Sequence, residues 1–590
     1  MPQLTKVLIA NRGEIAVRVA RACTDAGIAS VAVYADDDRD ALHVRVADEA
    51  YSLGGVSAAE TYLDMHKLIS VAHRAGADAV HPGYGFLSES AGFAQAVIDA
   101  GLIWIGPPPG AIRALGDKVS ARHVAAKVGA PLAAGTSEPV EDAGEIEAFA
   151  DAHGLPIVIK AAFGGGGRGL KVVENREDIP ELFDLAVREA TADFGRGECF
   201  VEQYLDRPRH IETQCLADSH GNVVVVSTRD CSLQRRHQKL VEEAPAPLIS
   251  AEQQDELVRA SKAILREAGY VGAGTCEFLL TRDGVISFLE VNTRLQVEHP
   301  VSEEVCGIDL VREQFRIAAG EELGYSFVEP RGHAFEFRLY AEDPSSFVPT
   351  PGKLTTLRLP GGPGVRLDFG YAAGDTMSDM FDSMIGKVIV WGADRIQALA
   401  RARRALAEIS VVGVPTGLLF HQAVVDAPDF TAADGHFGVH TRWIDTDFGE
   451  TLKSLAAEDE VAAAADASSA QPGRVVVEVG GKRLEIVIPS NLGALFPPRN
   501  PAPAPRPQRS LAAQVAPKRG AGTVTAPMQG VVVKVAVESG KTVEEGDLLV
   551  VIEAMKMEQS VYAPVAGTVS GLTVTAGDRV TSGQAICTVR

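Results

Sequence analysis

The sequence predicts a large mixed α/β protein that ends in a small all-β domain. Residues 4–10, 13–26 and 28–34 alternate between strand, helix and strand patterns, and this alternation resumes from about 115 to 445. Residues 523–590 instead contain short apolar strands separated by glycine turns, and they repeat internally. Two stretches of biased composition, 457–471 and 497–522, separate these parts and are typical of linkers.

Length and composition narrow the class of protein. The 590 residues allow three to five folded units at roughly 100–200 residues each. The net charge of −22 argues against a nucleic-acid partner. No run approaches 18 apolar residues, so no membrane span is expected, and the first ten residues resemble a strand more than a signal peptide. Seven scattered cysteines without a CxxC pair indicate neither structural zinc nor disulfides, which fits a cytoplasmic protein.

The N-terminal β-α-β unit is extended by strand patterns near 77–81 and 102–105, which predicts a parallel sheet. Its first turn reads Asn11-Arg-Gly-Glu14 and lacks the GxGxxG pattern. We therefore expect no dinucleotide site at this turn.

A glycine-rich loop follows the predicted strand Ile157-Val-Ile-Lys160. The loop Phe163-Gly-Gly-Gly-Gly-Arg-Gly169 would let backbone N–H groups approach phosphate oxygens, and Lys160 would add a positive charge. It is not a Walker A motif, because no Gly-Lys-Ser/Thr closes it. The alternative is a flexible surface loop.

Two glutamates are predicted to face each other across a hairpin. Asp283-Gly284 is a strong signal for a two-residue turn, and that register pairs Glu277 with Glu290. Facing carboxylates repel unless a cation lies between them, and Mg²⁺ prefers one or two carboxylates together with substrate phosphates. Asn292 would lie on the same face and could add a carbonyl oxygen. The alternative is a solvated strand face, which explains one glutamate but not the aligned pair.

The last domain repeats with a constant offset. Ala526-Pro527 recurs 37 residues later as Ala563-Pro564, and several Gly and Val positions match without a gap. Neither half can bury its own apolar face, so two copies related by a pseudo-two-fold axis would close a small β-sandwich. Lys556 falls in the insert between them and should lie at an exposed tight turn. It is interpreted as an attachment point; the alternative is an ordinary surface lysine.

These motifs together resemble a known family. Glu553-Ala-Met-Lys-Met557 and Ala526-Pro-Met-Gln-Gly530 resemble the biotinylation region of biotin carboxyl carrier domains. The glycine loop, Lys160, the facing glutamates and Asn292 look like an ATP-grasp enzyme. Four further segments are similar to biotin carboxylase: Glu290-Val-Asn-Thr-Arg-Leu-Gln-Val-Glu-His-Pro300, Arg229-Asp-Cys-Ser-Leu-Gln-Arg-Arg-His-Gln-Lys239, His81-Pro-Gly-Tyr-Gly-Phe-Leu-Ser-Glu89 and Gly332-His-Ala-Phe-Glu-Phe-Arg338. The whole is similar to the α-subunit of biotin-dependent acyl-CoA carboxylases.

The resemblance implies an α/β biotin carboxylase of the ATP-grasp type. Its parts would be a Rossmann-like N-terminal domain, an ATP-grasp lobe and core, a C-terminal α+β subdomain, a linker, and a small all-β biotinyl domain of the barrel-sandwich hybrid type. The expected limits are 1–115, 116–330 with a mobile lid at about 131–205, 331–446, 447–522 with a hairpin at 474–488 and a possible partner contact, and 523–590.

The resemblance also implies functional residues. The expected ATP contacts are Lys118, Lys160, Gly165, Gly166, Gly167, Glu202, Leu205, His210, Gln234, His237 and Glu277. Glu277, Glu290 and Asn292 would hold Mg²⁺ or Mn²⁺. Bicarbonate would lie against Lys239, Arg294, Gln296, Val297 and Glu298. Glu298 would be the base that deprotonates bicarbonate, with Arg294, Lys239 and Arg338 as the other catalytic residues, and Lys556 would carry biotin. For Arg338 the alternative is an ordinary ion pair with Glu336 or Glu342.

The implied activity is ATP- and bicarbonate-dependent carboxylation of biotin. No segment resembles a carboxyltransferase, so the carboxyl group would pass to a separate β-subunit that acts on acetyl-CoA or propionyl-CoA, as in fatty acid biosynthesis. A biotin protein ligase and a hetero-oligomer containing several α-subunits are the other expected partners. Two alternatives remain: an ATP-grasp ligase that joins a carboxylate to an amine, which does not explain Lys556, and a carrier with a degenerate, regulatory N-terminal region.

Overall fold

The structure is a computed structural model. It describes residues 4–136, 138–161, 170–194, 196–235, 238–455, 473–479, 482–488, 523–526, 530–554, 557–580 and 583–590. The chain forms two compact units, Met1–Glu450 and Thr451–Arg590, each of which is described by itself.

The first unit begins with a five-stranded parallel sheet in the order β3-β2-β1-β4-β5. The strands are β1 (Lys6–Ile9), β2 (Ala29–Tyr34), β3 (Glu49–Ser52), β4 (Ala79–His81) and β5 (Ile103–Trp104). The elements that accompany them are α1 (Gly13–Ala26), η1 (Asp36–Asp38), α2 (Leu42–Val46), α3 (Met65–Ala75), α4 (Ala91–Asp99) and α5 (Pro109–Gly116). The predicted parallel sheet is confirmed, but the half-buried edge strand β3 was not anticipated.

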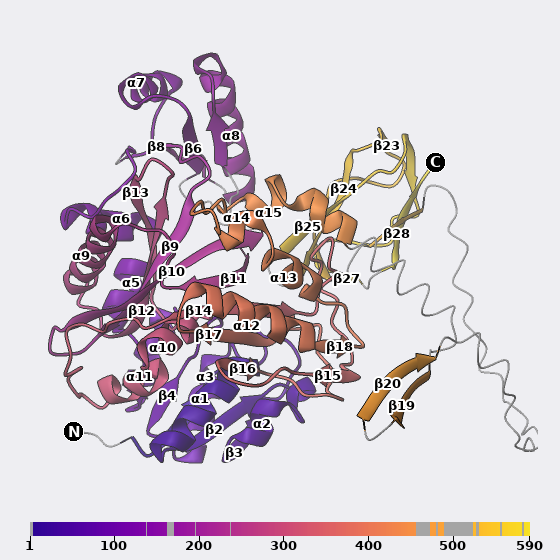
Figure 1. Cartoon of the computed structure of the whole chain (residues 1–590). Coiled ribbons are helices and arrows are strands. Elements are labelled where there is room, and N and C mark those ends of the chain that lie inside the picture. Colours follow the sequence, from indigo (N-terminus) through magenta and orange to yellow (C-terminus); the bar gives the residue numbers. More distant parts are fainter. Residues whose placement is uncertain are drawn as a thin grey trace, which may run out of the picture. The chain divides into compact units, whose positions relative to one another are not determined.

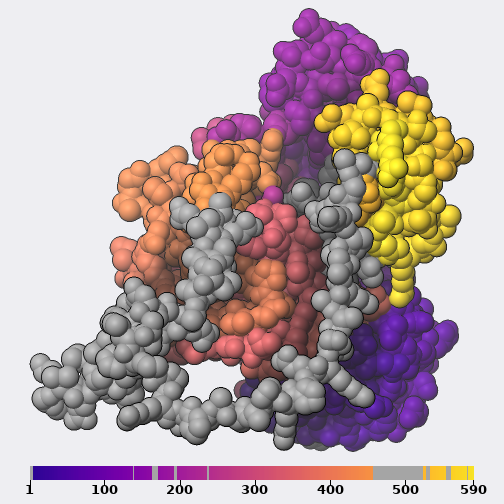
Figure 2. Space-filling view, turned by 90° about the vertical axis from the view of Figure 1, so that its right-hand side faces the viewer, coloured from indigo at the N-terminus to yellow at the C-terminus, as the bar shows by residue number. Residues whose placement is uncertain are grey.

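A smaller lobe projects from the rest of the first unit (Figures 1 and 2). It contains the antiparallel sheet β7-β6-β8, formed by β6 (Ile157–Ala161), β7 (Leu170–Val173) and β8 (Cys199–Gln203). The accompanying elements are α7 (Ala143–His153), η2 (Arg176–Asp178) and α8 (Ile179–Phe194). Ile146, Ile157, Ile159 and Val201 form its separate core with no exposed surface. The predicted phosphate loop at 163–169, with Gly165, Gly166 and Gly167, lies outside the described residues.

An eight-stranded antiparallel sheet forms the centre of the first unit, in the order β13-β12-β9-β10-β11-β14-β17-β16. Its strands are β9 (Arg209–Ala217), β10 (Val223–Arg235), β11 (Gln238–Ala244), β12 (Gly272–Leu280), β13 (Ile286–Asn292), β14 (His333–Tyr340), β16 (Val365–Phe369) and β17 (Met384–Gly392). Because β11 pairs with β14, one continuous sheet crosses the domain limit expected at residue 330.

Helices and a small two-stranded sheet complete the first unit. The helices are α6 (Lys118–Lys127), α9 (Ala251–Glu267), α10 (His299–Cys306), α11 (Leu310–Ala318), α12 (Arg395–Glu408), α13 (Leu418–Val424), α14 (Pro428–Thr431) and α15 (Trp443–Thr446). The small sheet pairs β15 (Thr356–Arg358) with β18 (Ser410–Val412). No helix in the described part of the chain is both long and apolar enough to span a bilayer.

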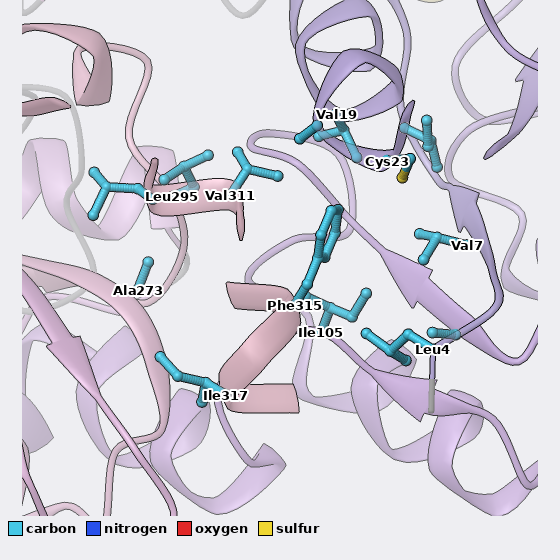
Figure 3. Close-up of a cluster of buried hydrophobic side chains, with 14 of the residues drawn as sticks. Leu4, Val7, Val19, Cys23, Ile105, Ala273, Leu295, Val311, Phe315 and Ile317 are labelled. Atoms are coloured by element: carbon cyan, nitrogen blue, oxygen red, sulfur yellow. The ribbon is translucent and has the colours of Figure 1, made fainter. Parts of the chain in front are cut away.

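A shared core joins the N-terminal sheet to the central part of the unit. Phe315 and Val311 of α11 lie with Val7 of β1, Val19 of α1 and Ile105 in one buried cluster (Figure 3). Val7, Val19, Ile105 and Val311 are fully buried. Burial of such side chains contributes roughly 1.5–3 kcal/mol each. Because the cluster also contains Leu216 of β9 and Val224 of β10, it joins the five-stranded sheet to the eight-stranded sheet.

The β12–β13 hairpin pairs Glu277 with Glu290 as predicted, but the turn is different. Thr281 and Val285 bracket a three-residue connection, in which Gly284 adopts φ +90°. This geometry resembles the common three-residue hairpin with glycine in a left-handed conformation. The register then shifts between Glu277 and Phe278, because Leu289 is an extra residue on β13. The predicted two-residue Asp283-Gly284 turn is therefore wrong, and a β-bulge restores the predicted pairing.

The second unit contains a hairpin and a repeated β-domain. β19 (Gly473–Val479) pairs with β20 (Lys482–Ile488), with Val479 opposite Lys482, which confirms the predicted hairpin; Gly480 and Gly481 lie outside the described residues. The β-domain contains β21 (Thr523–Thr525), β22 (Gly530–Val535), β23 (Thr542–Val543), β24 (Leu548–Ala554), β25 (Met557–Tyr562), β26 (Gly567–Ser570), β27 (Arg579–Val580) and β28 (Ala585–Val589).

The internal repeat explains the architecture of the β-domain. Its two sheets run β21-β28-β26-β23 and β25-β24-β22-β27. The offset of 37 residues maps β23 onto β27 and β22 onto β26. The corresponding turn residues Gly540 and Gly577 both adopt φ +95°. Each sheet therefore contains strands from both copies, so neither copy forms a complete sheet alone, which agrees with the prediction that two copies together close the domain.

Candidate active site

A row of ionisable side chains crosses the central sheet from β13 to β10. Glu290 pairs with Glu277, Glu277 pairs with Glu212, and Glu212 pairs with Arg229 on the next strand. At about 4.8 Å per strand, the row extends about 14 Å across one face of the sheet. Three carboxylates in register require cations between them, and the surrounding residues supply these.

Lys239 of β11 is the cation that three carboxylates share. Its Nζ lies 3.1 Å from Glu277 Oε1 and 2.8 Å from Glu298 Oε1, and it also contacts Glu212. Arg229 has no exposed side-chain surface and donates to the other oxygen of Glu212 at 2.9 Å. The lysine therefore connects the acidic row to Glu298 at the start of α10.

Burial and these contacts set the charge of the cluster. Burial alone would raise the pKa of Glu298, but Lys239 and Arg338 outweigh it and lower the pKa below its ordinary value. Burial also opposes the charge of His210, yet Glu277 and Glu212 raise the pKa of His210 to about 10. The pKa of Lys239 is raised well above its ordinary value, because its three carboxylates outweigh the effect of burial. Glu298 is thus ionised at neutral pH and held by two cations.

Arg338 of β14 contacts Glu298 from the other side. Its Nη2 lies 2.9 Å from Glu298 Oε2 and 2.5 Å from Glu242 Oε1. The ion pairs considered as an alternative, with Glu336 or Glu342, are not among the ion pairs of Arg338 in the described residues. Glu298 is 1% exposed on its side chain and lies between Arg338 and Lys239.

The strip that follows β13 brings the remaining predicted anion-binding residues together. Arg294 donates to Gln296 Oε1 at 2.7 Å and to Asn292 Oδ1 at 2.9 Å, and its Nε lies 3.1 Å from Glu89 Oε2. The carbonyl of Val297 accepts a 2.6 Å hydrogen bond from the buried Lys387. These contacts hold the segment between β13 and α10, which positions Glu298.

A cleft of about 500 Å³ opens beside Lys118, Glu290 and Asn292. Its volume lies within the range of about 300–1,000 Å³ typical of small-molecule sites. Lys118 Nζ lies 3.1 Å from Glu290 Oε2. In the lobe, Lys160 contacts Glu202, which Arg122 also approaches at 3.1 Å. Lys118 and Lys160 thus each pair with a carboxylate, and a phosphate-bearing ligand would compete with that carboxylate for the lysine ammonium group.

The sequence predicts that the facing pair Glu277 and Glu290 holds a divalent cation, and Glu290 places this pair at the edge of the cleft beside Lys118. Glu290 lines that cleft and is 29% exposed, while Glu277 is buried behind it. Asn292 donates to Glu277 Oε1 at 2.6 Å, so its amide joins the pair, although its carbonyl faces Arg294. In the part of the chain described, the larger groups of possible ligands are His210–Glu212–Glu277 and Glu212–Cys231–Glu298, both without Glu290.

The other predicted residues are distributed around this cluster. Gln234 approaches His210 Nδ1 at 3.4 Å, and His210 lies 3.0 Å from Glu277. Leu205 follows the end of β8 and is half-buried. His237 and Lys556 lie outside the described residues, although the strands next to Lys556 are described and Ala554 pairs with Met557.

The sequence analysis did not identify Glu212, Arg229 as its partner, or Lys387. A signal for Glu212 was present, because His210, Glu212 and Gln214 alternate along the strand and so place three polar side chains on one face. Lys387 carried no such signal. It is buried on β17 and reaches Glu14 at 3.2 Å as well as the Val297 carbonyl, contacts that depend on the tertiary fold.

The fold and this cluster define an ATP-grasp ligase. Family models match residues 3–112 (biotin carboxylase, N-terminal domain), 117–326 (carbamoyl-phosphate synthase L chain, ATP binding domain), 336–446 (biotin carboxylase C-terminal domain) and 522–589 (biotin-requiring enzyme). A biotin-dependent acyl-coenzyme A carboxylase alpha3 subunit from Mycobacterium leprae is 54% identical, over 100% of this chain and 99% of that protein. The chain belongs to the family of biotin-dependent acyl-CoA carboxylase α-subunits, and it is a biotin carboxylase that uses ATP, magnesium and biotin.

Solved structures agree with this assignment. A biotin carboxylase complex from Campylobacter jejuni matches with a TM-score of 0.70 and 39% identity, over 75% of this chain and 99% of that chain. The biotin carboxylase domain of 2-oxoglutarate carboxylase from Hydrogenobacter thermophilus, in complex with MgADP, ADP and bicarbonate, matches with a TM-score of 0.69 and 41% identity, over 75% and 98%.

Proposed function

We propose that the chain carboxylates a biotin attached to its own Lys556 and passes the carboxyl group to a separate carboxyltransferase β-subunit in the cytoplasm. Acetyl-CoA and propionyl-CoA are the proposed acceptors, and Mn²⁺ is a proposed substitute for Mg²⁺. The observation that carries the proposal is Glu298, an ionised buried carboxylate held between Lys239 and Arg338. A biotin protein ligase and further α-subunits complete the proposed set of partners.

In this proposal, the residues around Glu298 act on bicarbonate. Glu298 accepts the bicarbonate proton, and general-base catalysis of this kind typically contributes about 10²–10⁴-fold. Lys239, Arg294, Gln296 and the Val297 backbone hold the anion. Because all of these groups lie within one hydrogen-bonded cluster, they would position the anion without large movements.

On the nucleotide side, Lys118, Lys160, Glu202, Leu205, His210, Gln234 and His237 are proposed to contact ATP, with the loop containing Gly165, Gly166 and Gly167. Mg²⁺, when bound at Glu277, Glu290 and Asn292, neutralises phosphate charge. The lobe at about 131–205 is proposed to close over the nucleotide and exclude water.

Arg338 is proposed to face the oxygen of the biotin ureido group, where negative charge develops. Biotin supplies the nitrogen that accepts the carboxyl group. Arg338 then stabilises charge in the manner of an oxyanion hole, while its contact with Glu298 keeps it next to the bicarbonate.

The partner and the acceptor are tested together. The tagged chain is purified from its own cells with its associated subunits, and transfer of label from radioactive bicarbonate is measured over a series of acyl-CoA chain lengths. Label on acetyl-CoA or propionyl-CoA is the expected result, and Lys556→Arg should abolish it. Transfer that survives this substitution, or a preference for longer acyl chains, would contradict the proposal.

A further inference from the structure

A second pair of glutamates faces each other in the central sheet, outside the proposed roles. Glu242 of β11 and Glu336 of β14 are direct register partners, and neither has exposed surface. Directly opposed residues have Cβ atoms about 4.5–5.5 Å apart. Within the described residues, no group donates a hydrogen bond of regular geometry to any of their four oxygens. Two ionised carboxylates in this environment would repel strongly.

Glu277 and Glu290 have different surroundings from Glu242 and Glu336. Glu277 receives hydrogen bonds from Lys239, Asn292 and Gln296, and Glu290 is partly exposed beside Lys118. The three donors stabilise Glu277 as a carboxylate. Within the described residues, Glu242 has the ion pair with Arg338 and Glu336 has no hydrogen-bond partner, so burial outweighs the nearby cations: it raises the pKa of Glu242 to about 7 and the pKa of Glu336 well above its ordinary value.

Charged and titratable groups surround the pair on every packed element. They are Arg338 on β14, Lys387 on β17, Lys239 on β11, Cys231 on β10, and Glu298 at the start of α10. The nearest is Arg338, at 2.5 Å from Glu242 Oε1. The same guanidinium contacts Glu298. Arg338 therefore lies between the acid pair and the proposed base.

We propose that Glu242 and Glu336 share one proton and together form a positioning pair for Arg338. With one proton the pair carries a single negative charge, which is enough for Glu242 to anchor the guanidinium. With no proton, Arg338 would face three carboxylates, and its charge would be less available to a substrate anion. With two protons, the anchor would lose its charge. The inference rests on the proposed role of Arg338 toward biotin.

The protonation state is tested first, and independently of activity. Infrared spectra of the full-length protein at neutral pH should show a carboxylic-acid C=O band that is lost in Glu336→Gln. The matched control is Glu243→Gln, the next residue on β11, because Arg395 and His333 overcome burial and hold the pKa of Glu243 at about 2. An unchanged band in Glu336→Gln would overturn the shared proton, whatever the enzyme's activity.

Kinetics then test the link to Arg338. Glu336→Gln keeps a hydrogen-bond donor toward Glu242, so its kcat/KM for free biotin should stay within about threefold of the wild-type value. Glu336→Met leaves Glu242 without a hydrogen-bond partner on β14, so its kcat/KM for free biotin should fall at least about tenfold. Bicarbonate-dependent ATP cleavage without biotin should change less than about threefold in both variants. Alkaline pH should lower kcat/KM for biotin in the wild type more than in Glu336→Gln.

Two results would overturn the positioning role: equal kcat/KM for biotin in the Gln and Met variants, or an equal loss of ATP cleavage and biotin use. If Glu336→Met does not fold, the pH comparison between the wild type and Glu336→Gln decides. A further result separates the two proposals. If Arg338→Lys loses biotin-dependent activity while Glu336→Gln and Glu336→Met behave as the wild type, the proposed role of Arg338 toward biotin stands and only the positioning role of the Glu242–Glu336 pair is rejected.

Discussion

Lys239 and Glu298 form a buried ion pair, with Nζ 2.8 Å from Glu298 Oε1. Because Lys239 also contacts Glu212 and Glu277, one ammonium group joins the proposed bicarbonate base to the carboxylate proposed for the metal. Substitutions at either end of this connection should therefore affect different steps.

Glu298→Gln should retain ATP binding and lose bicarbonate-dependent ATP cleavage by about 10²–10⁴-fold, because the amide cannot accept the proton. Nucleotide binding is measured by calorimetry and cleavage by phosphate release with free biotin. Glu256→Gln, on the exposed face of α9 and paired with Arg259, is the matched control and should behave as the wild type. Wild-type turnover in Glu298→Gln would remove this residue as the base.

Glu290→Gln should raise the Mg²⁺ concentration needed for half-maximal activity by at least about tenfold, since one of two facing carboxylates is lost. The measurement is a Mg²⁺ titration of ATP cleavage at fixed free ATP, again with Glu256→Gln as the control. An unchanged Mg²⁺ requirement would exclude Glu290 from the metal site.

Lys239→Met should lower the free energy of unfolding of the first unit by about 3–5 kcal/mol, because it leaves buried carboxylates without their cation. Lys127→Met, which breaks the exposed ion pair with Glu267, should cost less than about 1 kcal/mol. Chemical denaturation compares the two variants. Similar small losses would mean that Arg229, His210 and Arg338 alone balance the cluster.

The sequence predicted the pairing of Glu277 with Glu290 correctly, but it did not predict the turn length and the bulge that produce this pairing. Hairpin rules and side-chain alternation are local, and they correctly placed both residues on one face. They did not predict the bulge at Leu289, because two register changes cancel: the longer turn shifts the pairing and the bulge restores it. The two-fold arrangement of the last domain was predictable from the sequence, because matching Gly and Val residues recur at a constant spacing of 37 residues.

The acidic cluster around Lys239 was less accessible to sequence analysis. Glu212 and Glu242 lie on β9 and β11, and their significance depends on which strands become neighbours in the sheet. The pairing of β11 with β14 brings together residues nearly a hundred positions apart, so Glu242 and Glu336 meet only in the fold. Burial, which decides whether such a carboxyl group is charged, is likewise a tertiary property.

Lys556→Arg should abolish the streptavidin signal of the cell-expressed chain, because arginine lacks the primary amine that forms the amide bond. The variant should keep activity toward free biotin, since the first unit is unchanged. Lys541→Arg, at another exposed position of the same domain, is the matched control and should keep the signal. A signal that survives in Lys556→Arg would place biotin elsewhere.

His421 gives the first unit a calculable sensitivity to acid. It is buried in α13, its Nε2 donates to the Arg338 carbonyl at 2.7 Å, and burial lowers its pKa to about 4. An unfolded histidine titrates near pH 6.5, so below that pH the unfolded state binds more protons and stability falls until about pH 4. Lowering the pH from 7.5 to 5.5 should cost about 1.4 kcal/mol through this residue.

The measurement is the change in unfolding free energy between these two pH values, in the wild type and in His421→Gln. The variant loses stability at both pH values because the hydrogen bond is altered, but its pH-dependent loss should be smaller by about 1.4 kcal/mol. His436→Gln, at an exposed position, should retain the full pH dependence. An equal pH dependence in His421→Gln and wild type would show that His421 accepts a proton in the folded protein, and that the backbone of Arg338 is not held by a neutral imidazole.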